Sequence, residues 1–275
     1  MTRAELEDTG PDVDLPPPTS GSSVQRWQRG TLSRVQDCLA EEVPVALCYN
    51  GISHVVMMAS PCDLEEFALG FSLSEGIIEQ PQQLYSIEIS PRAEGIEINL
   101  QVSARQEQLL KQRQRNLTGR TGCGLCGGDS LSTAIRPVKA VTDAPSLSDA
   151  AVQRAIAQLN AHQPLQALTG AVHGAAWCSL EGDILQLRED VGRHNALDKL
   201  IGALVAKQID RTRGFLLMSS RASYELIHKA ASVGIGNLVA VSAPTALAIR
   251  LAEQAGIQVL GFAREGRHVR YTTLT

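Results

Sequence analysis

The 275-residue sequence lacks any apolar run close to the roughly 20 residues that a membrane-spanning helix needs. It therefore gives no support to an integral membrane protein. The N-terminal stretch is acidic and rich in proline, without the apolar core of a secretory signal, so we expect a cytoplasmic protein. Six cysteines at irregular spacings in a chain of this length indicate reduced thiols, because disulfide frameworks are typical of short secreted domains.

The sequence also lacks an excess of positive charge and any repeat of fixed period. Its formal net charge is -4, so the general electrostatic footprint of a nucleic-acid-binding protein is missing and we expect no nucleic-acid partner. A site for an anion would have to come from a local group of arginines or lysines. With 44% hydrophobic and 20% charged residues, the composition is that of an ordinary globular protein.

Two cysteines lie within a run of glycines, Thr121-Gly-Cys123-Gly-Leu-Cys126-Gly-Gly128. Glycines let the backbone bend and approach a ligand closely. The preceding segment is basic, and nearby cations favour the reactive thiolate over the thiol. The pattern therefore predicts a loop for sulfur chemistry or for a metal.

Three interpretations of this dithiol compete. A structural zinc site needs a second pair of Cys or His ligands with its own short spacing, and the sequence offers only His173 and single cysteines. A thioredoxin-like centre places its first cysteine after a strand and at the start of a helix, whereas here a basic helix comes first. The third interpretation is a sulfur relay, in which a cysteine carries sulfur as a reversible persulfide.

We divide the chain into a disordered N-terminal segment (1–22), an α+β domain that ends in the dithiol loop (23–136) and an α/β domain (137–275). Pro, Gly, Ser and acidic residues dominate the N-terminal segment. In the second part, Asn50-Gly51 predicts a hairpin turn between two apolar strands. Asp63 is expected to cap a helix, and two alternating segments near residues 87 and 100 are expected to pair as antiparallel strands.

The third part alternates strands with helices from Ser148, a predicted helix cap, to Phe262. Repeated strand–helix–strand units predict a largely parallel sheet with helices on both faces. In such sheets ligands bind outside the carboxyl ends of the strands.

Hydroxyls and arginines follow several of these predicted strands. Helix starts and arginines suit an anionic phosphate, so we predict that these segments meet and bind a nucleotide or pyrophosphate. Asp190 either orients a base or ribose or simply caps a helix. His173 precedes a strand among small residues, and His194 lies in a turn at the predicted ligand mouth. The predicted contact residues are His173, Asp190, Arg193, His194, Ser219, Arg221, Ser242, Arg264 and Arg267.

Several long segments resemble the FdhD family of sulfurtransferases that serve formate dehydrogenase. The resemblance runs from about Val43 to Tyr271. Its segments are Thr118-Gly-Arg120-Thr-Gly-Cys123-Gly-Leu-Cys126-Gly, Thr169-Gly-Ala-Val-His173, Glu189-Asp-Val-Gly-Arg193-His194-Asn-Ala-Leu-Asp198-Lys199, Ser219-Ser-Arg221-Ala-Ser-Tyr224-Glu225, Val43-Pro-Val-Ala-Leu and Phe67-Ala-Leu-Gly-Phe-Ser-Leu-Ser-Glu-Gly-Ile-Ile78.

The resemblance implies that the protein takes sulfur from a cysteine desulfurase and passes it to the molybdenum cofactor in its bis-guanine-dinucleotide form, before insertion into a formate dehydrogenase. It implies that Cys123 is the catalytic cysteine and Cys126 its partner. It places cofactor contacts on Phe262, Ala263, Arg264, Glu265, Gly266 and Arg267.

The resemblance also implies a homodimer and a C-terminal three-layer α/β domain similar to cytidine deaminases. The zinc motif of those enzymes, His-x-Glu with a later Pro-Cys-x-x-Cys, is missing from the sequence, so we expect no permanent metal. Two other functions stay open: a molybdenum cofactor chaperone that moves no sulfur, and a zinc-stabilised structural protein.

Overall fold

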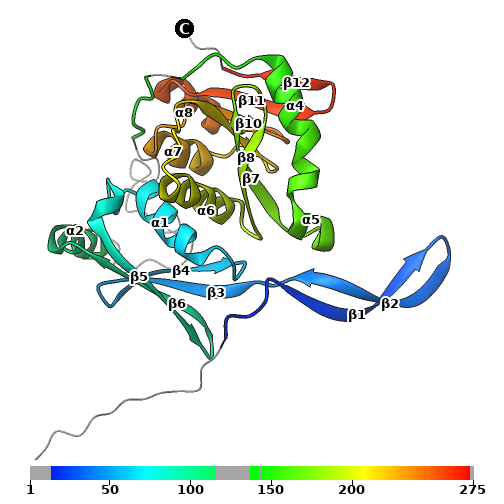
Figure 1. Cartoon of the computed structure of the whole chain (residues 1–275), viewed down its shortest axis with the longest axis horizontal. Coiled ribbons are helices and arrows are strands. Elements are labelled where there is room, and N and C mark those ends of the chain that lie inside the picture. Colours follow the sequence, from blue (N-terminus) through cyan, green and yellow to red (C-terminus); the bar gives the residue numbers. More distant parts are fainter. Residues whose placement is uncertain (1–13, 116–136, 143, 273–275) are drawn as a thin grey trace, which may run out of the picture.

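The structure is a computed structural model that describes residues 14–115, 137–142 and 144–272. Its strands form three sheets, of two, four and six strands, and helices cover the two larger ones (Figure 1). The chain is therefore a mixed α/β protein, as the sequence predicts. Among the helices in these ranges, none combines the length and hydropathy needed to cross a bilayer.

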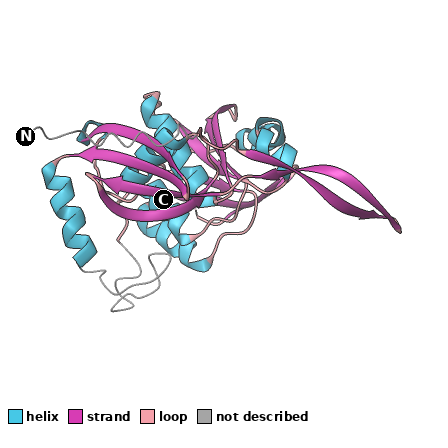
Figure 2. Cartoon of the chain, turned by 90° about the horizontal axis from the view of Figure 1, so that it is seen from below, coloured by secondary structure: helices cyan, strands magenta, loops and turns pink. Residues whose placement is uncertain are grey.

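A long β-hairpin, called here the arm, projects from the rest of the molecule (Figures 1 and 2). It consists of β1 (Thr19–Gln28) and β2 (Thr31–Ala40), joined through a turn in which Arg29 and Gly30 have positive φ. Thr19–Ser22 fall in the range predicted to be disordered, and that prediction is wrong for these four residues. They pair with residues 37–40 of β2, so their backbone groups have hydrogen-bond partners. Their polar side chains do not indicate this strand in the sequence.

The four-stranded sheet has the order β4-β3-β6-β5. Its strands are β3 (Val43–Tyr49), β4 (Ile52–Ala59), β5 (Leu84–Arg92) and β6 (Gly95–Val102), with a short 3-10 helix, η1 (Pro81–Gln83), before β5. Asn50 and Gly51 both have positive φ, which confirms the predicted turn between β3 and β4. The antiparallel pairing of β5 with β6 is also confirmed.

Helix α1 (Leu64–Ser74) packs between this sheet and the rest of the molecule, and α2 (Ala104–Arg115) follows β6. Asp63 does occupy the position before α1, but the prediction that it caps the helix is wrong. Its backbone is left-handed, with φ of 53°, and its side chain makes no capping hydrogen bond.

The six-stranded sheet has the order β12-β11-β10-β9-β7-β8. It contains β7 (His173–Ser179), β8 (Ile184–Asp190), β9 (Gly214–Met218), β10 (Asn237–Ala240), β11 (Gln258–Arg264) and β12 (Arg267–Arg270). Among the described strands of this sheet only β9, β10 and β11 pair in parallel, so the prediction of a largely parallel sheet is wrong. The short connections β7–β8 and β11–β12 form hairpins, and hairpins are necessarily antiparallel.

Helices lie on both faces of this sheet, as predicted, which gives three layers. The helices are α4 (Asp149–Leu159), the 3-10 helix η2 (Asn160–His162), α5 (Pro164–Thr169), α6 (Arg193–Ala206), α7 (Tyr224–Ser232) and α8 (Ala246–Ala255). Alternate residues of each strand enter two cores: Trp177 packs with α6, α7 and α8, whereas Ala176 and Cys178 pack with α4. Ser148 caps α4 by accepting a hydrogen bond from Ala151 N, as predicted.

The larger core joins the two regions that the sequence analysis separates at residue 137. It includes Phe67 of α1 together with Leu197 of α6. The two helices approach each other closely at two glycines, because a Cβ atom on Gly70 would lie 1.8 Å from Asp198 O and one on Gly202 would lie 1.9 Å from Glu66 O. The domain boundary itself stays a prediction.

Candidate functional site

The carboxyl ends of four strands meet at one edge of the six-stranded sheet, called here the carboxyl edge. Strands β8, β9, β10 and β11 run in the same direction, because β8 and β9 are both antiparallel to β7. Hydrogen bonds connect three of these ends: Ser242 N, after β10, donates to Ser220 O, after β9 (3.3 Å), and Phe262 N of β11 donates to Ser242 O (3.1 Å). The ends of β9, β10 and β11 therefore lie side by side, and that they bind a ligand stays a prediction.

His173 begins β7 and pairs with Asp190 in the sheet register, which places it at this edge. Its side chain is half-buried. Burial lowers the pKa of His173 and the charge of Arg193 lowers it further, although Asp190 acts in the opposite direction. At neutral pH the ring is therefore a neutral hydrogen-bonding group.

Asp190 does not face the carboxyl edge as a ligand group. Its side chain is fully buried and forms an ion pair with Lys199 Nζ at 2.7 Å. The carboxylate also accepts hydrogen bonds from Ser60 N (3.0 Å), Gly192 N (2.8 Å) and Asn195 Nδ2 (3.0 Å). Both oxygens are occupied, so the carboxylate is not open to a base or ribose, and α6 begins at Gly192 without a side-chain cap, so Asp190 does not cap that helix either.

Arg193 and His194 begin α6 and remain partly exposed. Burial, together with the charge of Arg193, lowers the pKa of His194 to about 4, so its ring is neutral at physiological pH. Glu225 of α7 lies opposite, with its Oε2 3.7 Å from His194 Nε2, which is too long for a hydrogen bond. Glu225 is not among the site residues predicted from the sequence, although it is the last residue of one of the segments of resemblance.

Three further predicted residues follow β9 and β10. Ser219 and Ser242 are partly exposed, and the side chain of Arg221 is exposed. The Ser219 hydroxyl accepts from Gly174 N, while Ser242 O accepts from Phe262 N at 3.1 Å. These contacts fix the order of the loops along the edge and leave the Arg221 side chain available to a ligand.

Strands β11 and β12 and the turn between them, Arg264–Arg267, carry the last group of predicted contacts. Phe262 has φ of 51°, in a bulge of the β11–β12 ladder, and 42% of it is exposed. A left-handed backbone at a bulky residue is rare, and besides turns it is found at strained ligand sites. Arg264, Glu265, Gly266 and Arg267 are exposed at the turn. Ala263 differs from its neighbours, because its side chain is buried in the core and only its backbone could contact a ligand. The prediction of a contact through the Ala263 side chain is therefore wrong.

Two buried lysines lie behind the edge, between α1, α6 and α7, and the sequence analysis missed both. Lys199 is completely buried and, besides Asp190, donates to Ser60 O at 3.0 Å. Lys229 pairs with Asp198 and with Glu75, each at 2.9 Å, and lies over the Phe71 ring at 5.1 Å. Burial opposes the charge of Lys229, but the two carboxylates outweigh it and raise the pKa of the lysine. Both lysines thus attach the four-stranded sheet and α1 to the domain that carries the edge.

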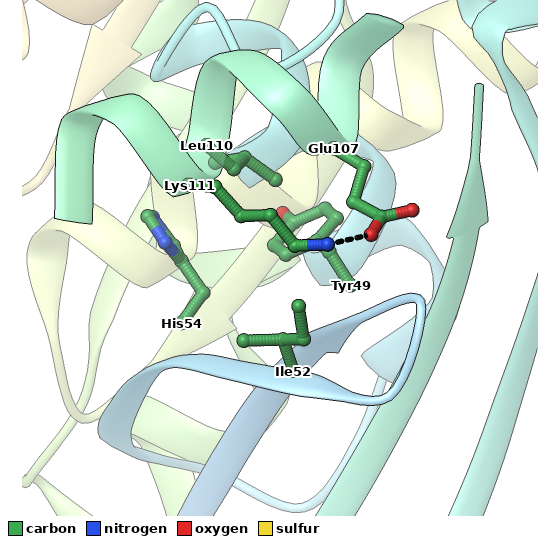
Figure 3. Close-up of a pocket in the computed structure, with 6 residues that line it drawn as sticks. All are labelled: Tyr49, Ile52, His54, Glu107, Leu110 and Lys111. Carbon is green, nitrogen blue, oxygen red and sulfur yellow. Dashed lines mark hydrogen bonds and ion pairs between the residues drawn. The ribbon is translucent and has the colours of Figure 1, made fainter. Parts of the chain in front are cut away.

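Cys123 and Cys126, the predicted catalytic pair, lie outside the described residues. The helix before them, α2, is fastened to the β3–β4 turn through Asn50, whose Nδ2 donates to Glu107 Oε2 at 2.7 Å. Figure 3 shows a small pocket beneath α2, lined by Tyr49, Ile52, His54, Glu107, Leu110 and Lys111, in which the Lys111 ammonium pairs with Glu107. Within the described ranges, no group of three His, Cys, Asp or Glu side chains is arranged to hold a metal ion.

Comparison with known proteins agrees with the resemblance in the sequence. The model of the FdhD/NarQ family matches residues 40–274. This chain belongs to the FdhD/NarQ family. A protein of Cupriavidus necator named sulfur carrier protein FdhD is 53% identical over 259 residues, which cover 94% of this chain and 90% of that protein. One of the same name from Xanthomonas campestris is 47% identical over 262 residues, covering 95% and 93%.

The fold is also shared with a crystal structure from Desulfotalea psychrophila described as a formate dehydrogenase accessory protein. The TM-score is 0.74, with 94% of this chain and 98% of that chain covered. At 22% identity this similarity concerns the fold alone. It places the mixed α/β architecture of this FdhD/NarQ family member among solved structures.

Proposed function

We propose that this protein is a sulfur carrier required for formate dehydrogenase activity. It takes sulfur from a cysteine desulfurase onto Cys123 and delivers it to the molybdenum cofactor, held as its bis-guanine dinucleotide at the carboxyl edge. The cofactor is the acceptor of sulfur, not a resident group of the protein. The sulfurated cofactor then passes to a formate dehydrogenase in the cytoplasm.

The observation that carries this proposal is the convergence of hydroxyls and arginines at the carboxyl edge. Guanine dinucleotide phosphates are anionic, and guanidinium groups bind phosphate oxygens through paired, charge-assisted hydrogen bonds. The exposed arginines of the β11–β12 turn supply such groups, and the exposed Phe262 ring beside them suits stacking on a base. The names of the relatives support the sulfur-carrying part of the proposal.

The proposed transfer has two steps. The Cys123 thiolate attacks the outer sulfur of the desulfurase persulfide, so a new S–S bond forms on Cys123 while the S–S bond of the desulfurase breaks. In the second step the Cys126 thiolate attacks Cys123 Sγ, and the outer sulfur leaves as hydrosulfide toward the metal. The two electrons come from the dithiol, and a cellular thiol reductant must then reduce the Cys123–Cys126 disulfide.

Incubation of the full chain with a cysteine desulfurase and cysteine tests the first step. Mass spectrometry of peptides should show an additional sulfur atom on Cys123, and the Cys123→Ala variant should lose both the label and cofactor sulfuration. A Cys123 that stays unmodified, or a Cys123→Ala variant that restores dehydrogenase activity, would indicate a cofactor chaperone that moves no sulfur.

Two alternatives are separated by simple measurements on the purified protein. Metal analysis should give far less than one zinc per chain, whereas a zinc-stabilised structural protein would hold about one ion tightly. The homodimer implied by the family resemblance stays a prediction, which sedimentation analysis can check.

A further inference from the structure

A chain of side-chain hydrogen bonds runs from the start of α4 to the β11–β12 turn. Gly266 N donates to Gln153 Oε1 at 2.7 Å, Gln153 Nε2 lies 3.1 Å from His268 Nδ1, and His268 Nε2 lies 2.8 Å from Asp149 Oδ1. Asp149 and Gln153 are four residues apart and therefore share one face of α4. This face supports the turn that carries Arg264 and Arg267.

The direction of every bond in this chain is determined by the backbone amide at its end. Gly266 N–H can only donate, so the Gln153 amide must direct its oxygen toward it. The amide nitrogen of Gln153 then donates to His268 Nδ1, which must be unprotonated, and the ring proton lies on Nε2 and is donated to Asp149. A neutral His268 with its proton on Nε2 is the form that satisfies the whole chain.

Asp149 ends this series of hydrogen bonds and is itself held in place by Arg270. Arg270 NH2 donates to Asp149 Oδ1 at 2.6 Å and to Leu147 O at 2.8 Å. The hydrogen bond from Arg270, with a further one from His268, lowers the pKa of Asp149, so the carboxylate is ionised over the whole range in which histidines titrate. Asp149 from α4 and Arg270 from β12 are thus the charged groups bonded within this network.

We propose that Gln153 and His268 are positioning residues for the guanine nucleotide. They hold the Arg264–Arg267 turn in its nucleotide-binding conformation through their hydrogen bonds to Gly266 N and to Asp149. This inference rests on the proposed function of the turn. The turn needs such support because β12 has only four residues, forms the outermost strand of its sheet, and follows Gly266 with φ of 75°.

Calorimetric titration of GDP into the full chain at pH 8 tests the proposal. Gln153→Met keeps the length of the side chain without its hydrogen bonds, and we expect about fivefold to tenfold weaker binding, the worth of one hydrogen bond. His268→Asn is the conservative variant: the Asn oxygen can accept from Gln153 as Nδ1 does, so it should bind GDP nearly as well as the native chain.

Gln158→Met is the matched control: Gln158 lies on the same helix but donates to Arg154 O and Gly182 O, away from the turn. It should leave the GDP affinity unchanged.

Equal GDP affinities for the native chain and Gln153→Met would overturn the positioning role. Failure of the native chain to bind GDP would instead reject the proposed function. If Gln153→Met fails to fold, His268→Leu replaces it. This variant removes the acceptor for Gln153 and should bind GDP more weakly than His268→Asn, and equal affinities of the two variants would contradict the proposal.

Discussion

The segment from Glu189 to Lys199 contributes to two regions of opposite character. At the interface between α1 and α6, its residues Asp190 and Lys199 are fully buried and bonded to each other. At the carboxyl edge, the side chains of Arg193 and His194 are partly exposed, and within the described residues the Arg193 Nε and His194 Nε2 atoms have no hydrogen-bond partner. One stretch of sequence therefore joins a buried ion pair to partly exposed side chains at the edge, and the first holds the second in place.

The largest expected effect is at the interface. Lys199→Met removes the cation that compensates Asp190 and leaves a buried carboxylate without its ion pair, which should lower the free energy of unfolding by about 3–5 kcal/mol. Urea denaturation measures the change. The control is Lys207→Met, since the exposed side chain of this lysine bonds only to Gln186 in the described structure and its loss should cost less than about 0.5 kcal/mol. Equal losses for the two variants would contradict the comparison.

The close approach of the two helices should be almost as sensitive. A methyl group at Gly202 would lie 1.9 Å from Glu66 O, so Gly202→Ala must push α1 away from α6 and should cost about 3 kcal/mol. Gly21→Ala, in the arm, has no atom within 4 Å of its new methyl group and should leave the urea midpoint unchanged. A Gly202→Ala chain of native stability would mean that the two helices are not packed as described.

At the carboxyl edge we expect the reverse: large effects on binding with small effects on stability. Replacing Arg264 and Arg267 together by Ala should weaken GDP binding by about 100-fold, on the scale of one or two charge-assisted hydrogen bonds. The free energy of unfolding should change by less than about 0.5 kcal/mol, because both side chains are exposed. Unchanged GDP affinity by calorimetry would remove the turn from the site.

The smallest effect concerns pH. The pKa of His194 is lowered to about 4 in the folded chain, below the ordinary value near 6.5 of the unfolded chain. Between these values the unfolded chain binds the extra proton, so stability is lost as the pH falls from about 6.5 toward 4. Since the side chain is partly exposed, we expect His194→Gln to remove only about 1 kcal/mol of this loss between pH 6.5 and pH 5. Identical urea midpoints for the two chains at pH 5 and at pH 6.5 would show that His194 does not titrate in this way.

The elements that repeat a clear local pattern could be predicted from the sequence. The Asn50-Gly51 turn and the Ser148 cap each depend on a few adjacent residues, and the structure has both. The arm could not be predicted, because its residues alternate little in hydropathy and Trp27 and Leu32 point into solvent. Its stability comes from pairing along ten registered positions, which single-strand periodicity does not reveal.

For the site, too, general rules predict one part, and long-range packing decides the other. That polar loops meet at the carboxyl ends of the strands follows from the general geometry of such sheets, and the ends of β9, β10 and β11 do so. The role of Asp190 could not be predicted, since its partners include Ser60, which lies 130 residues earlier in the chain. The burial of Lys199 and Lys229 likewise depends on how α1 packs against α6 and α7, which is a long-range property of the fold.

The chain contains two tryptophans, and they lie in contrasting surroundings. Trp27, near the tip of the arm, is 70% exposed, whereas Trp177 in the sheet is completely buried. Their fluorescence should therefore separate into a long-wavelength and a short-wavelength component. A Trp27→Phe chain would provide an optical signal from the sheet alone, and a Trp177→Phe chain would give a probe for anything that covers the arm.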